Sequence, residues 1–483
     1  MSLLRPENRP IAAQSCSTSL TLSHWLAWAH DWMWNVPPGI LLAGLGCASL
    51  DVSTYLADSH LPLAPLLTAC GVMLTLFGAF ALFLAATSQT HPHWLTRLAR
   101  PLLLPMLLWA LWTSSQMAHI VFVSWPRRLT SAQNYGSDDM YYNHYNALLV
   151  LHGQNPYVGQ RLTGVVGYFH VIAYTPIARG KFATPGRRPT PHQLHLIYLQ
   201  FAASPETPPP EIDPRTTHSY PAGAFLVAIP FVWAGAPNIA IGQVLALLAL
   251  WGCLIMAAPA RWRLLIALLA LTMINGALQV AGGDFEMWAL AFTLGGWLMR
   301  DHRWGSAALI GLACATKQTA WLAAPLYLVW VWRSYGGKEA AQRTLIALGA
   351  FTLINLPWII ASPNAWLTSL FLPISLPLLP DGSGIIALST SGALPYAPRW
   401  VYSALEAFVW LGALGWYWRA WRRFPYAGLA LAALPLLFAW RSPERYFELL
   451  PLAGLFALAF TLRQAPEASA DDAPDYSKLP SLA

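Results

Sequence analysis

The chain has 483 residues, of which 56% are hydrophobic and only 10% are charged, and its mean hydropathy is +0.45. A soluble domain carries roughly 25% charged residues, so this composition excludes an ordinary cytoplasmic enzyme. The net charge of +7 comes from short basic clusters between apolar runs, a pattern typical of membrane topology signals and not of a nucleic-acid-binding surface.

The first 37 residues are polar and then rich in Trp. They lack the compact apolar core and small-residue cleavage site of a secretory signal peptide, so we expect a cytoplasmic N-terminal segment without a cleavable leader. The five cysteines are scattered along the chain, and their spacing predicts neither a disulfide framework nor a zinc site.

Long apolar runs predict an all-α polytopic membrane protein with about 11–13 transmembrane helices. Several runs are shorter than the roughly 20 residues of a straight crossing, so we expect tilted or broken segments. A further run at 220–234 contains Pro230 and is expected to be re-entrant or to lie along the outer surface. The candidate spans are 38–57, 62–87, 101–125, 239–258, 262–281, 284–299, 304–316, 319–333, 343–361, 400–418, 424–440 and 446–462.

Basic clusters between these runs determine the expected orientation, because short cytoplasmic loops are enriched in Lys and Arg. With all five clusters in the cytoplasm, both termini are cytoplasmic, and the turns near 282–284, Lys317 and Arg441–Tyr446 face outside. The clusters are Arg97 and Arg100; Arg261 and Arg263; Arg300 and Arg303; Arg333, Lys338 and Arg343; and Arg419, Arg422 and Arg423.

This orientation predicts a plasma or inner-membrane protein in five parts. Because the last part is acidic and contains Pro and Ser, we expect it to be disordered. The parts are an N-terminal cytoplasmic segment (1–37), N-terminal transmembrane helices (38–125), a large extracytoplasmic loop with juxtamembrane helices (126–218), a transmembrane bundle (219–462) and a cytoplasmic tail (463–483).

The outer loop opens with two adjacent carboxylates, Asp138 and Asp139, before a predicted helix at 140–152. The helix would carry Tyr141, Tyr145, Leu148 and His152 on one face. Ser137 or Asp138 could cap its start and Gly153 could end it. The carboxylates could therefore serve only as a cap and as partners of the helix dipole. Alternatively, one of them is a general base at the outer membrane face.

Lys317 lies between two apolar runs of about a dozen residues each, in the sequence Ala-Thr-Lys-Gln-Thr. A lysine at this position is costly unless it pairs or reaches water. It could extend its ammonium group to the interface, or it could hold an anionic ligand.

A second charged cluster precedes the last apolar run. Arg441 and Arg445 are one helical turn apart, as are Glu444 and Glu448, which gives two adjacent stripes of opposite sign if the segment is helical. The cluster could be an internal ion-pair network. It could also be a phosphate clamp, for which two Arg are better suited than Lys.

Asp284 and Glu286 follow two glycines at the start of another run. They could simply favour a helix N-terminus. Together with Asp138 and Asp139 they could bind Mg²⁺ or Mn²⁺ if the four carboxylates converge. The sequence does not require a metal, and we predict no metal-binding residues.

The predicted orientation places a carboxylate pair, a membrane-level lysine and a two-arginine turn on the same outer face. A base can deprotonate an acceptor hydroxyl, and fixed cations can stabilise charge that develops on a leaving phosphate. This combination suits a lipid-linked anionic sugar donor. The candidate substrate contacts on this face are Tyr142, His218, Tyr220, Asp284, Glu286, Glu444 and Tyr446.

These residues resemble the GT-C superfamily of polytopic glycosyltransferases, especially its bacterial mannosyltransferase-like branch that uses polyprenyl-phosphate sugars. Five short stretches between about 138 and 460 carry the resemblance. They are the carboxylate helix ending in Gly-Gln-Asn-Pro-Tyr (138–157), Tyr-Pro (220–221), Gly-Asp (283–284), the run ending in Ala-Thr-Lys-Gln-Thr (311–319) and Arg-Tyr (445–446).

The resemblance implies a GT-C-like fold, a polyprenyl-phosphate sugar donor, an extracytoplasmic acceptor and inversion at the anomeric carbon. Asp138 or Asp139 would be the base, and Lys317 with Arg441 or Arg445 would contact the donor phosphate. The chain departs from the family in two ways: two apolar runs precede the usual first span, and the segment 176–218 is long and rich in Pro, Arg and His. The first departure suggests an N-terminal addition.

Two other functions remain open. A transporter or flippase for a lipid-linked saccharide would need polar groups along a path through the bundle, and the predicted spans offer few. An O-antigen ligase or polymerase would use the same outer loop but would transfer whole oligosaccharides from a diphosphate carrier.

Overall fold

The computed structural model describes residues 36–57, 64–87, 101, 103–131, 135–170, 177–183, 190–213, 218–273, 277–278, 280–281, 286–447 and 449–464. The chain divides into two units, Met1–Pro37 and Pro38–Ala483. Nearly all described residues belong to the second unit, Pro38–Ala483. Most of the predicted cytoplasmic N-terminal segment, and the predicted tail from residue 465 onward, lie outside the described residues.

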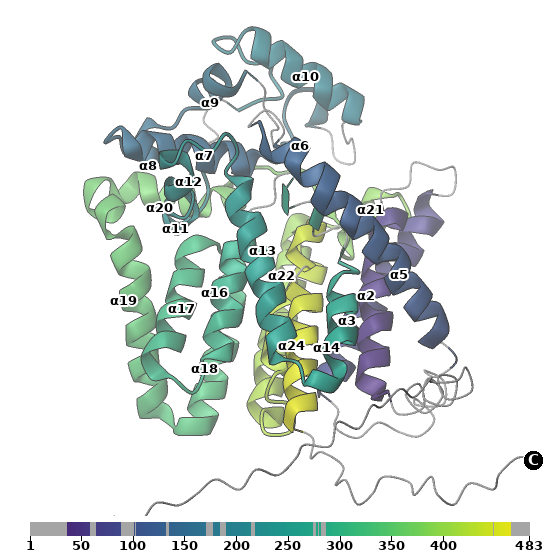
Figure 1. Ribbon diagram of the computed structural model, residues 1–483. Helices are drawn as coiled ribbons and strands as arrows, with labels where there is room; N and C mark the ends of the chain where they lie inside the picture. The colour runs from purple at the N-terminus through teal and green to yellow at the C-terminus, as the bar shows by residue number, and fades with distance from the viewer. Residues whose placement is uncertain are drawn as a thin grey trace, which may run out of the picture. The chain divides into compact units, whose positions relative to one another are not determined.

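The second unit is mostly helical (Figure 1), as the sequence predicts for an all-α protein. Its strands are limited to the parallel pair β1 (Asp381–Gly382) and β2 (Arg441–Ser442) within the described residues. In chain order the helices are α2 (Pro38–Ala57), α3 (Ala64–Thr87), α5 (Leu103–His119), the π-helical turn η2 (Ile120–Ser124), α6 (Trp125–Leu129), α7 (Asp138–Leu151), α8 (Pro156–Gly159), α9 (Leu162–Phe169), η4 (Gly180–Phe182), α10 (Pro191–Ala203), α11 (Gly223–Leu226), α12 (Ile229–Trp233), α13 (Ala240–Ala257), η5 (Ala260–Trp262), α14 (Arg263–Ala270), α16 (Met287–Leu298), α17 (Arg303–Thr316), α18 (Ala320–Tyr335), α19 (Gly337–Ala361), α20 (Pro363–Ser375), α21 (Ile386–Thr390), α22 (Arg399–Ala420), α23 (Ala427–Ala433), η6 (Pro435–Phe438), η7 (Glu444–Phe447) and α24 (Leu449–Gln464).

Each apolar run that the sequence analysis identified coincides with helical structure. Among the described residues, four helical stretches are both long and apolar enough to cross a membrane: Pro65–Ala85, Leu104–Leu129, Ala240–Ala257 and Gly337–Ala361. Other apolar helices are shorter, including Met287–Leu298 and Leu450–Arg463. The run at 262–281 is interrupted, since α14 ends at Ala270.

Large apolar side chains are exposed on several of the long helices. On α5, Leu104 and Trp112 are about three-fifths exposed, and on α19, Leu345 and Leu353 are about seven-tenths exposed. Soluble proteins rarely leave contiguous apolar surface in water. Helix faces of this kind are compatible with contact to lipid.

Small residues allow the helices to approach closely. A Cβ atom on Gly311 of α17 would lie 2.3 Å from the carbonyl oxygen of Ala347 in α19. Close backbone approach at small residues is a common way for membrane helices to pack, because lipid tails supply no hydrophobic driving force between them. The pair α17–α19 matters for the site because α17 ends at the residue before Lys317.

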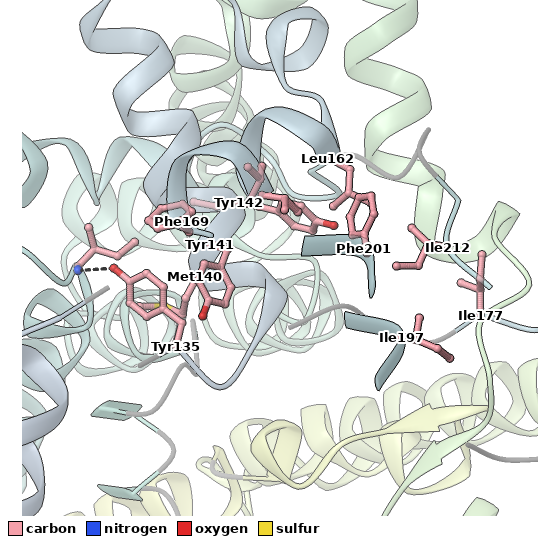
Figure 2. Close-up of a cluster of buried hydrophobic side chains, with 14 of the residues drawn as sticks. Tyr135, Met140, Tyr141, Tyr142, Leu162, Phe169, Ile177, Ile197, Phe201 and Ile212 are labelled. Carbon is pink, nitrogen blue, oxygen red and sulfur yellow. Dashed lines mark hydrogen bonds between the residues drawn. The ribbon is translucent and has the colours of Figure 1, made fainter. Parts of the chain in front are cut away.

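Helices α7–α10 lie beyond one end of the bundle, with α10 and α9 farthest from it (Figure 1). Their shared core is aromatic and aliphatic (Figure 2), and the rings of Tyr135 and Phe169 each pack edge-on against Tyr141 at about 5 Å. The Tyr135 hydroxyl accepts a hydrogen bond from the backbone N–H of Ile239 at 2.8 Å. The predicted outer segment thus has a hydrophobic core of its own, linked to the start of α13.

Helix α7 begins two residues before the predicted 140–152 helix and ends next to Gly153, whose φ of +72° favours glycine. Ser137 occupies the N-cap position, but its hydroxyl does not cap the helix. The predicted apolar face is only partly correct, because Tyr141 is fully buried while His152 is exposed. Polar residues on other faces of α7 are buried as well.

The run at 220–234, which we expected to be re-entrant or superficial, forms two short helices, α11 and α12. Both pack against α7, and α11 also packs against α17. The run is therefore folded between the outer helices and the end of the bundle, and α13 begins separately at Ala240.

Candidate functional site

A buried charged cluster forms where three distant parts of the chain meet. Asp139 comes from the first turn of α7, Glu286 precedes α16, and Lys317 ends α17. The ammonium nitrogen of Lys317 lies 2.7 Å from Glu286 Oε1 and 3.4 Å from Asp139 Oδ2. All three residues are at most 2% exposed. We refer to these three residues as the charged cluster.

The charged cluster has two carboxylates for one ammonium group, so neighbouring hydrogen bonds are needed to stabilise its negative charge. Tyr220 donates its hydroxyl to Asp139 Oδ2 at 3.0 Å, and the Ser137 hydroxyl donates to Asp139 Oδ1. Thr319 donates to Glu286 Oε2 at 3.2 Å. The ammonium of Lys317 also lies 5.0 Å from the centre of the Tyr220 ring, in cation–π geometry.

Tyr220 is positioned by a segment, residues 218–222, whose backbone is held by side chains from other elements. Gln160 accepts from the N–H of His218 at 2.9 Å, and Gln318 donates to the carbonyl of Ser219 at 2.5 Å. Two more side chains complete this support: Tyr157 donates to the carbonyl of Tyr220 at 3.0 Å, and Asn355 accepts from the N–H of Ala222 at 2.9 Å. The 218–222 segment is thus fixed without regular secondary structure.

Gly223 allows this segment to lie directly on the end of α17. A Cβ atom at residue 223 would lie 2.4 Å from the carbonyl oxygen of Ala315 and 2.9 Å from Thr316 Oγ1. Both atoms are backbone or short side-chain atoms with little freedom to move. The close approach places Tyr220 beside Lys317, which immediately follows Thr316.

The structure distinguishes the two adjacent carboxylates. Asp139 is 1% exposed, and each of its oxygens accepts from a partner within the protein. Asp138 is half-buried, and its Oδ1 accepts from the backbone N–H of Asp139 at 3.1 Å. Asp138 is the first residue of α7 and not its N-cap, so its charge can favour the helix dipole but its side chain does not cap the helix. Asp139 belongs to the charged cluster.

His218 lies against the charged cluster as a neutral ring. Its ring is 5.6 Å from that of Tyr220 and 5.7 Å from that of Tyr157, measured between centroids. Burial lowers the pKa of His218 to about 3, although the Tyr220 backbone and the charge of Asp139 favour protonation. At neutral pH, His218 therefore contributes hydrogen-bonding atoms and no charge.

A small cavity of about 20 Å³ adjoins Glu286. Its wall includes Thr293, Thr319 and Tyr446. This volume is enough for about one water molecule. The cavity places Tyr446, a predicted substrate contact, at the same end of the bundle as Glu286.

Arg441, a predicted phosphate ligand, lies in β2 and binds the neighbouring loop. Its guanidinium donates to the carbonyl of Leu379 at 2.9 Å and lies 3.7 Å from an oxygen of Asp381. Leu378 in the same loop pairs with Ile177 of the predicted outer segment. Arg441 is therefore at the α7–α10 end of the bundle, but its described contacts are with the loop and not with Lys317.

The remaining predicted site residues are not all among the described residues. Tyr142 is buried in the core formed by α7–α10. Asp284 and the side chains of Glu444 and Arg445 lie outside the described residues, so their roles remain predictions. Within the described part of the chain, no three metal-binding side chains come together.

A second charged network lies at the other end of α17, about 20 Å away by the helical rise. The Arg343 guanidinium donates to Glu339 at 2.9 Å, to Tyr327 and Ser306 at 3.1 Å, and to the carbonyl of Arg300. Two of the predicted cytoplasmic basic clusters meet here, one through Arg300 and Arg303 and the other through Arg343. The structure thus separates these basic clusters from the charged cluster at opposite ends of the same helix.

The sequence analysis missed several polar residues around the site. Asn143 and Asn146 follow Asp139 at four- and seven-residue spacing, so they share its face of α7. Both are fully buried. The spacing was visible in the sequence, but Asn is also common at helix ends and in turns. Gln318 and Thr319 also support the site. Apart from their positions next to Lys317, nothing in the sequence indicated this role.

No protein-family model matches the chain, and no curated protein or solved structure matches it. The function must therefore be argued from the residues of this chain and from their geometry.

Proposed function

We propose that the chain is an integral-membrane glycosyltransferase. It would transfer a sugar from a polyprenyl-phosphate donor to an extracytoplasmic glycolipid, glycan or protein, with inversion at the anomeric carbon, and its fold would be GT-C-like. The observation that carries the proposal is the meeting of Asp139, Glu286 and Lys317 at one end of an apolar helical bundle, with Asp138 alongside.

Asp138 is the better of the two candidate bases. A general base needs lone pairs that an acceptor hydroxyl can reach. Asp139 is buried and engaged at both oxygens, whereas Asp138 is half-buried at the beginning of the helix. In the proposed reaction, Asp138 takes the acceptor proton as the acceptor oxygen bonds to the anomeric carbon. The bond from that carbon to the phosphate oxygen breaks, and its electron pair leaves with the phosphate.

Asp139 and Lys317 are assigned a positioning role. Lys317 has two carboxylates within 3.4 Å, so a donor phosphate would have to compete with them for its ammonium group. Among the described residues, Arg441 contacts one carboxylate, that of Asp381 at the longer distance of 3.7 Å, and Arg441 is only half-buried. We therefore assign the donor phosphate first to Arg441, together with the predicted ligand Arg445.

We infer from three observations that the site faces the extracytoplasmic side of a plasma or inner membrane. The charged cluster lies at the α7–α10 end of the bundle, and the basic Arg300, Arg303 and Arg343 lie at the opposite end. Basic clusters favour the cytoplasm. The exposed apolar faces of α5 and α19 suit a lipid environment.

The test uses the full chain in lipid nanodiscs with radiolabelled decaprenyl-phosphate mannose, glucose, galactose and arabinose, and with membrane extracts as acceptors. We expect transfer from one of these donors. Asp138→Asn should abolish transfer and leave the thermal unfolding midpoint unchanged. Asp139→Asn should lower the transfer rate and the unfolding midpoint together. The absence of transfer from all donors, or full turnover in Asp138→Asn and in the double variant, would refute the proposal.

A transporter for a lipid-linked saccharide is the second candidate. It is favoured by the burial of the charged cluster, since paired ionisable groups inside membrane proteins also serve in ion-coupled transport. The two functions differ in the fate of the donor. Movement of an intact labelled polyprenyl-phosphate sugar across proteoliposome membranes, without release of polyprenyl phosphate, would identify a transporter.

A further inference from the structure

Next to Asp139, four buried polar side chains have atoms without hydrogen-bond partners among the described residues. The atoms are Oδ1 of Asn143, Oδ1 and Nδ2 of Asn146, Nε2 of Gln160, and the ring nitrogens of His218, which approach the Tyr220 backbone but make no hydrogen bond of ordinary geometry. These residues are at most 2% exposed. We refer to Asn143, Asn146, Gln160 and His218 as the polar row.

The polar row differs from two other buried amides of the described residues, Asn238 and Asn355, which are bonded at both their oxygen and their nitrogen. Asn238 donates to the carbonyls of Arg128 and Ser131 and accepts from the N–H of Ala240, at 2.8–3.0 Å. Asn355 is bonded at both its oxygen and its nitrogen. Buried polar groups without partners are rare and costly in native proteins. Several together indicate a partner outside the chain.

The four side chains face a common region. Asn143 and Asn146 lie on the same face of α7 as Asp139, and Val150 on that face packs against Tyr157 and Phe225. The His218 ring lies beside Tyr157 and Phe225, at 5.7 and 5.4 Å between centroids. Gln160 accepts from the backbone of His218. The polar row therefore runs along α7, from the charged cluster toward these aromatic rings.

The chemistry of the polar row selects an uncharged, hydroxyl-rich group. Amides and a neutral imidazole offer both donors and acceptors but no charge. A phosphate would be disfavoured, because Asp139 and Glu286 are nearby and Lys317 is already paired with both. A sugar ring carries several hydroxyls that donate and accept, and its apolar face can pack on the rings of Tyr157 and His218.

We propose that the polar row is a sugar-binding subsite that closes around its ligand. This inference rests on the proposed function, since it names the group that the same site would hold. All four side chains are buried, so a sugar reaches them only when the hydrogen bonds that hold the 218–222 segment break and the segment moves away from α7. Closure then pairs their atoms with sugar hydroxyls. The sugar could belong to the donor lipid or to the acceptor, and the experiment distinguishes the two.

Asn146→Leu is the most direct variant because it removes both unpartnered atoms and keeps the branched shape and the number of side-chain heavy atoms. The probes are citronellyl phosphate, its esters with mannose, glucose, galactose and arabinose, and the octyl glycosides of the same sugars below their micellar concentrations. Binding to the full chain in nanodiscs is measured by microscale thermophoresis. The wild type should bind one of the citronellyl-phosphate sugars more tightly than citronellyl phosphate alone, or it should bind one of the octyl glycosides more tightly than octanol.

In Asn146→Leu this preference should fall about tenfold, while the affinity for citronellyl phosphate stays unchanged. A loss confined to the phosphate esters assigns the donor sugar, and a loss confined to the glycosides assigns the acceptor sugar. Without ligand, the thermal unfolding midpoint of Asn146→Leu should equal or exceed that of the wild type, because an unsatisfied amide has been removed. The matched control Asn238→Leu, which removes a fully paired amide, should lower the midpoint and keep the sugar preference.

The inference is overturned if the wild type shows no sugar preference in either arm, or if Asn146→Leu retains it. It is also overturned if the midpoint of Asn146→Leu falls as far as that of Asn238→Leu, because the amide would then be paired within the protein. The two proposals can fail separately. If Asp138→Asn abolishes transfer while Asn146→Leu leaves the KM for the donor unchanged, the proposed function stands and only the subsite is refuted.

Discussion

Lys317 and Glu286 form an ion pair with a nitrogen–oxygen distance of 2.7 Å, and both residues are almost completely buried. Asp139 lies on the other side of the same ammonium group at 3.4 Å. Removal of charges from water is costly, and the mutual attraction of a buried pair compensates for this cost only when both partners are present. The charged cluster should therefore depend on its single cation.

We expect Lys317→Met to destabilise the protein by about 3–5 kcal/mol, because two buried carboxylates would lose the ammonium group that contacts them both. Circular dichroism of the full chain in nanodiscs would show this as a lower thermal unfolding midpoint. Lys338→Met is the matched control, since Lys338 is exposed and its loss should change little. Adding Glu286→Gln to Lys317→Met should restore part of the stability. Equal midpoints for the two lysine variants would contradict the prediction.

Tyr220→Phe tests the hydrogen bond between the tyrosine hydroxyl and Asp139 at 3.0 Å. A hydrogen bond to a charged group contributes roughly 1.5–3 kcal/mol, so the unfolding midpoint should fall by less than in Lys317→Met. The same change at Tyr168, whose ring is half exposed on α9, is the control. In a double-mutant cycle, the effects of Tyr220→Phe and Asp139→Asn should not add, because both remove the same bond. Additive effects would show that the bond does not contribute.

The sequence was sufficient to predict the helices because apolar runs of this length need little tertiary information. The runs at 38–57 and 239–258 agree within two residues with α2 and α13. The orientation argument also placed Asp139, Glu286 and Lys317 at one end of the bundle, where the structure brings them into contact. A lysine between apolar runs must find a partner, but which carboxylates it finds depends on how α7, α16 and α17 pack.

Local spacing was less informative where a side chain has several possible partners. Ser137 or Asp138 was expected to cap α7, yet the Ser137 hydroxyl donates to the carboxylate of Asp139 and Asp138 is already the first helical residue. Arg441 was expected to act with Arg445, yet its described partners are Leu379 and Asp381, more than fifty residues away in the chain. Contacts of this kind depend on the path of the loop before α22, and no local pattern in the sequence encodes that path.

Gly223→Ala tests the close approach that holds Tyr220 beside Lys317. The added Cβ would lie 2.4 Å from the carbonyl oxygen of Ala315, so the 218–222 segment must move away from α17. We expect a loss of stability of about 1–3 kcal/mol, as for other overpacked positions, together with a loss of any transfer activity. Gly167→Ala is the matched control, because a Cβ there meets nothing within 4 Å and Ala is the better helix former. If both variants behaved like the wild type, the close approach would be irrelevant to the site.

His144 gives a prediction about pH. Its Nδ1 lies 2.9 Å from the Tyr135 hydroxyl, and burial lowers its pKa to about 4, below the ordinary value near 6.5. A histidine with a lowered folded-state pKa stabilises the protein fully above about pH 6.5. It loses that contribution as the pH falls toward 4, at up to about 1.4 kcal/mol per pH unit, because the unfolded chain binds the proton first.

We therefore expect the unfolding midpoint of the wild type to fall between about pH 7.5 and about pH 4.5, and to fall less in His144→Phe. The comparison must use the difference between the two pH values, since His144→Phe also removes the contact with Tyr135 and lowers the midpoint at both. His195→Phe, at an exposed position of α10, should show the wild-type difference. Because His218 also has a lowered pKa, some acid sensitivity should remain in His144→Phe. An undiminished fall in this variant would show that His144 is not held neutral by burial.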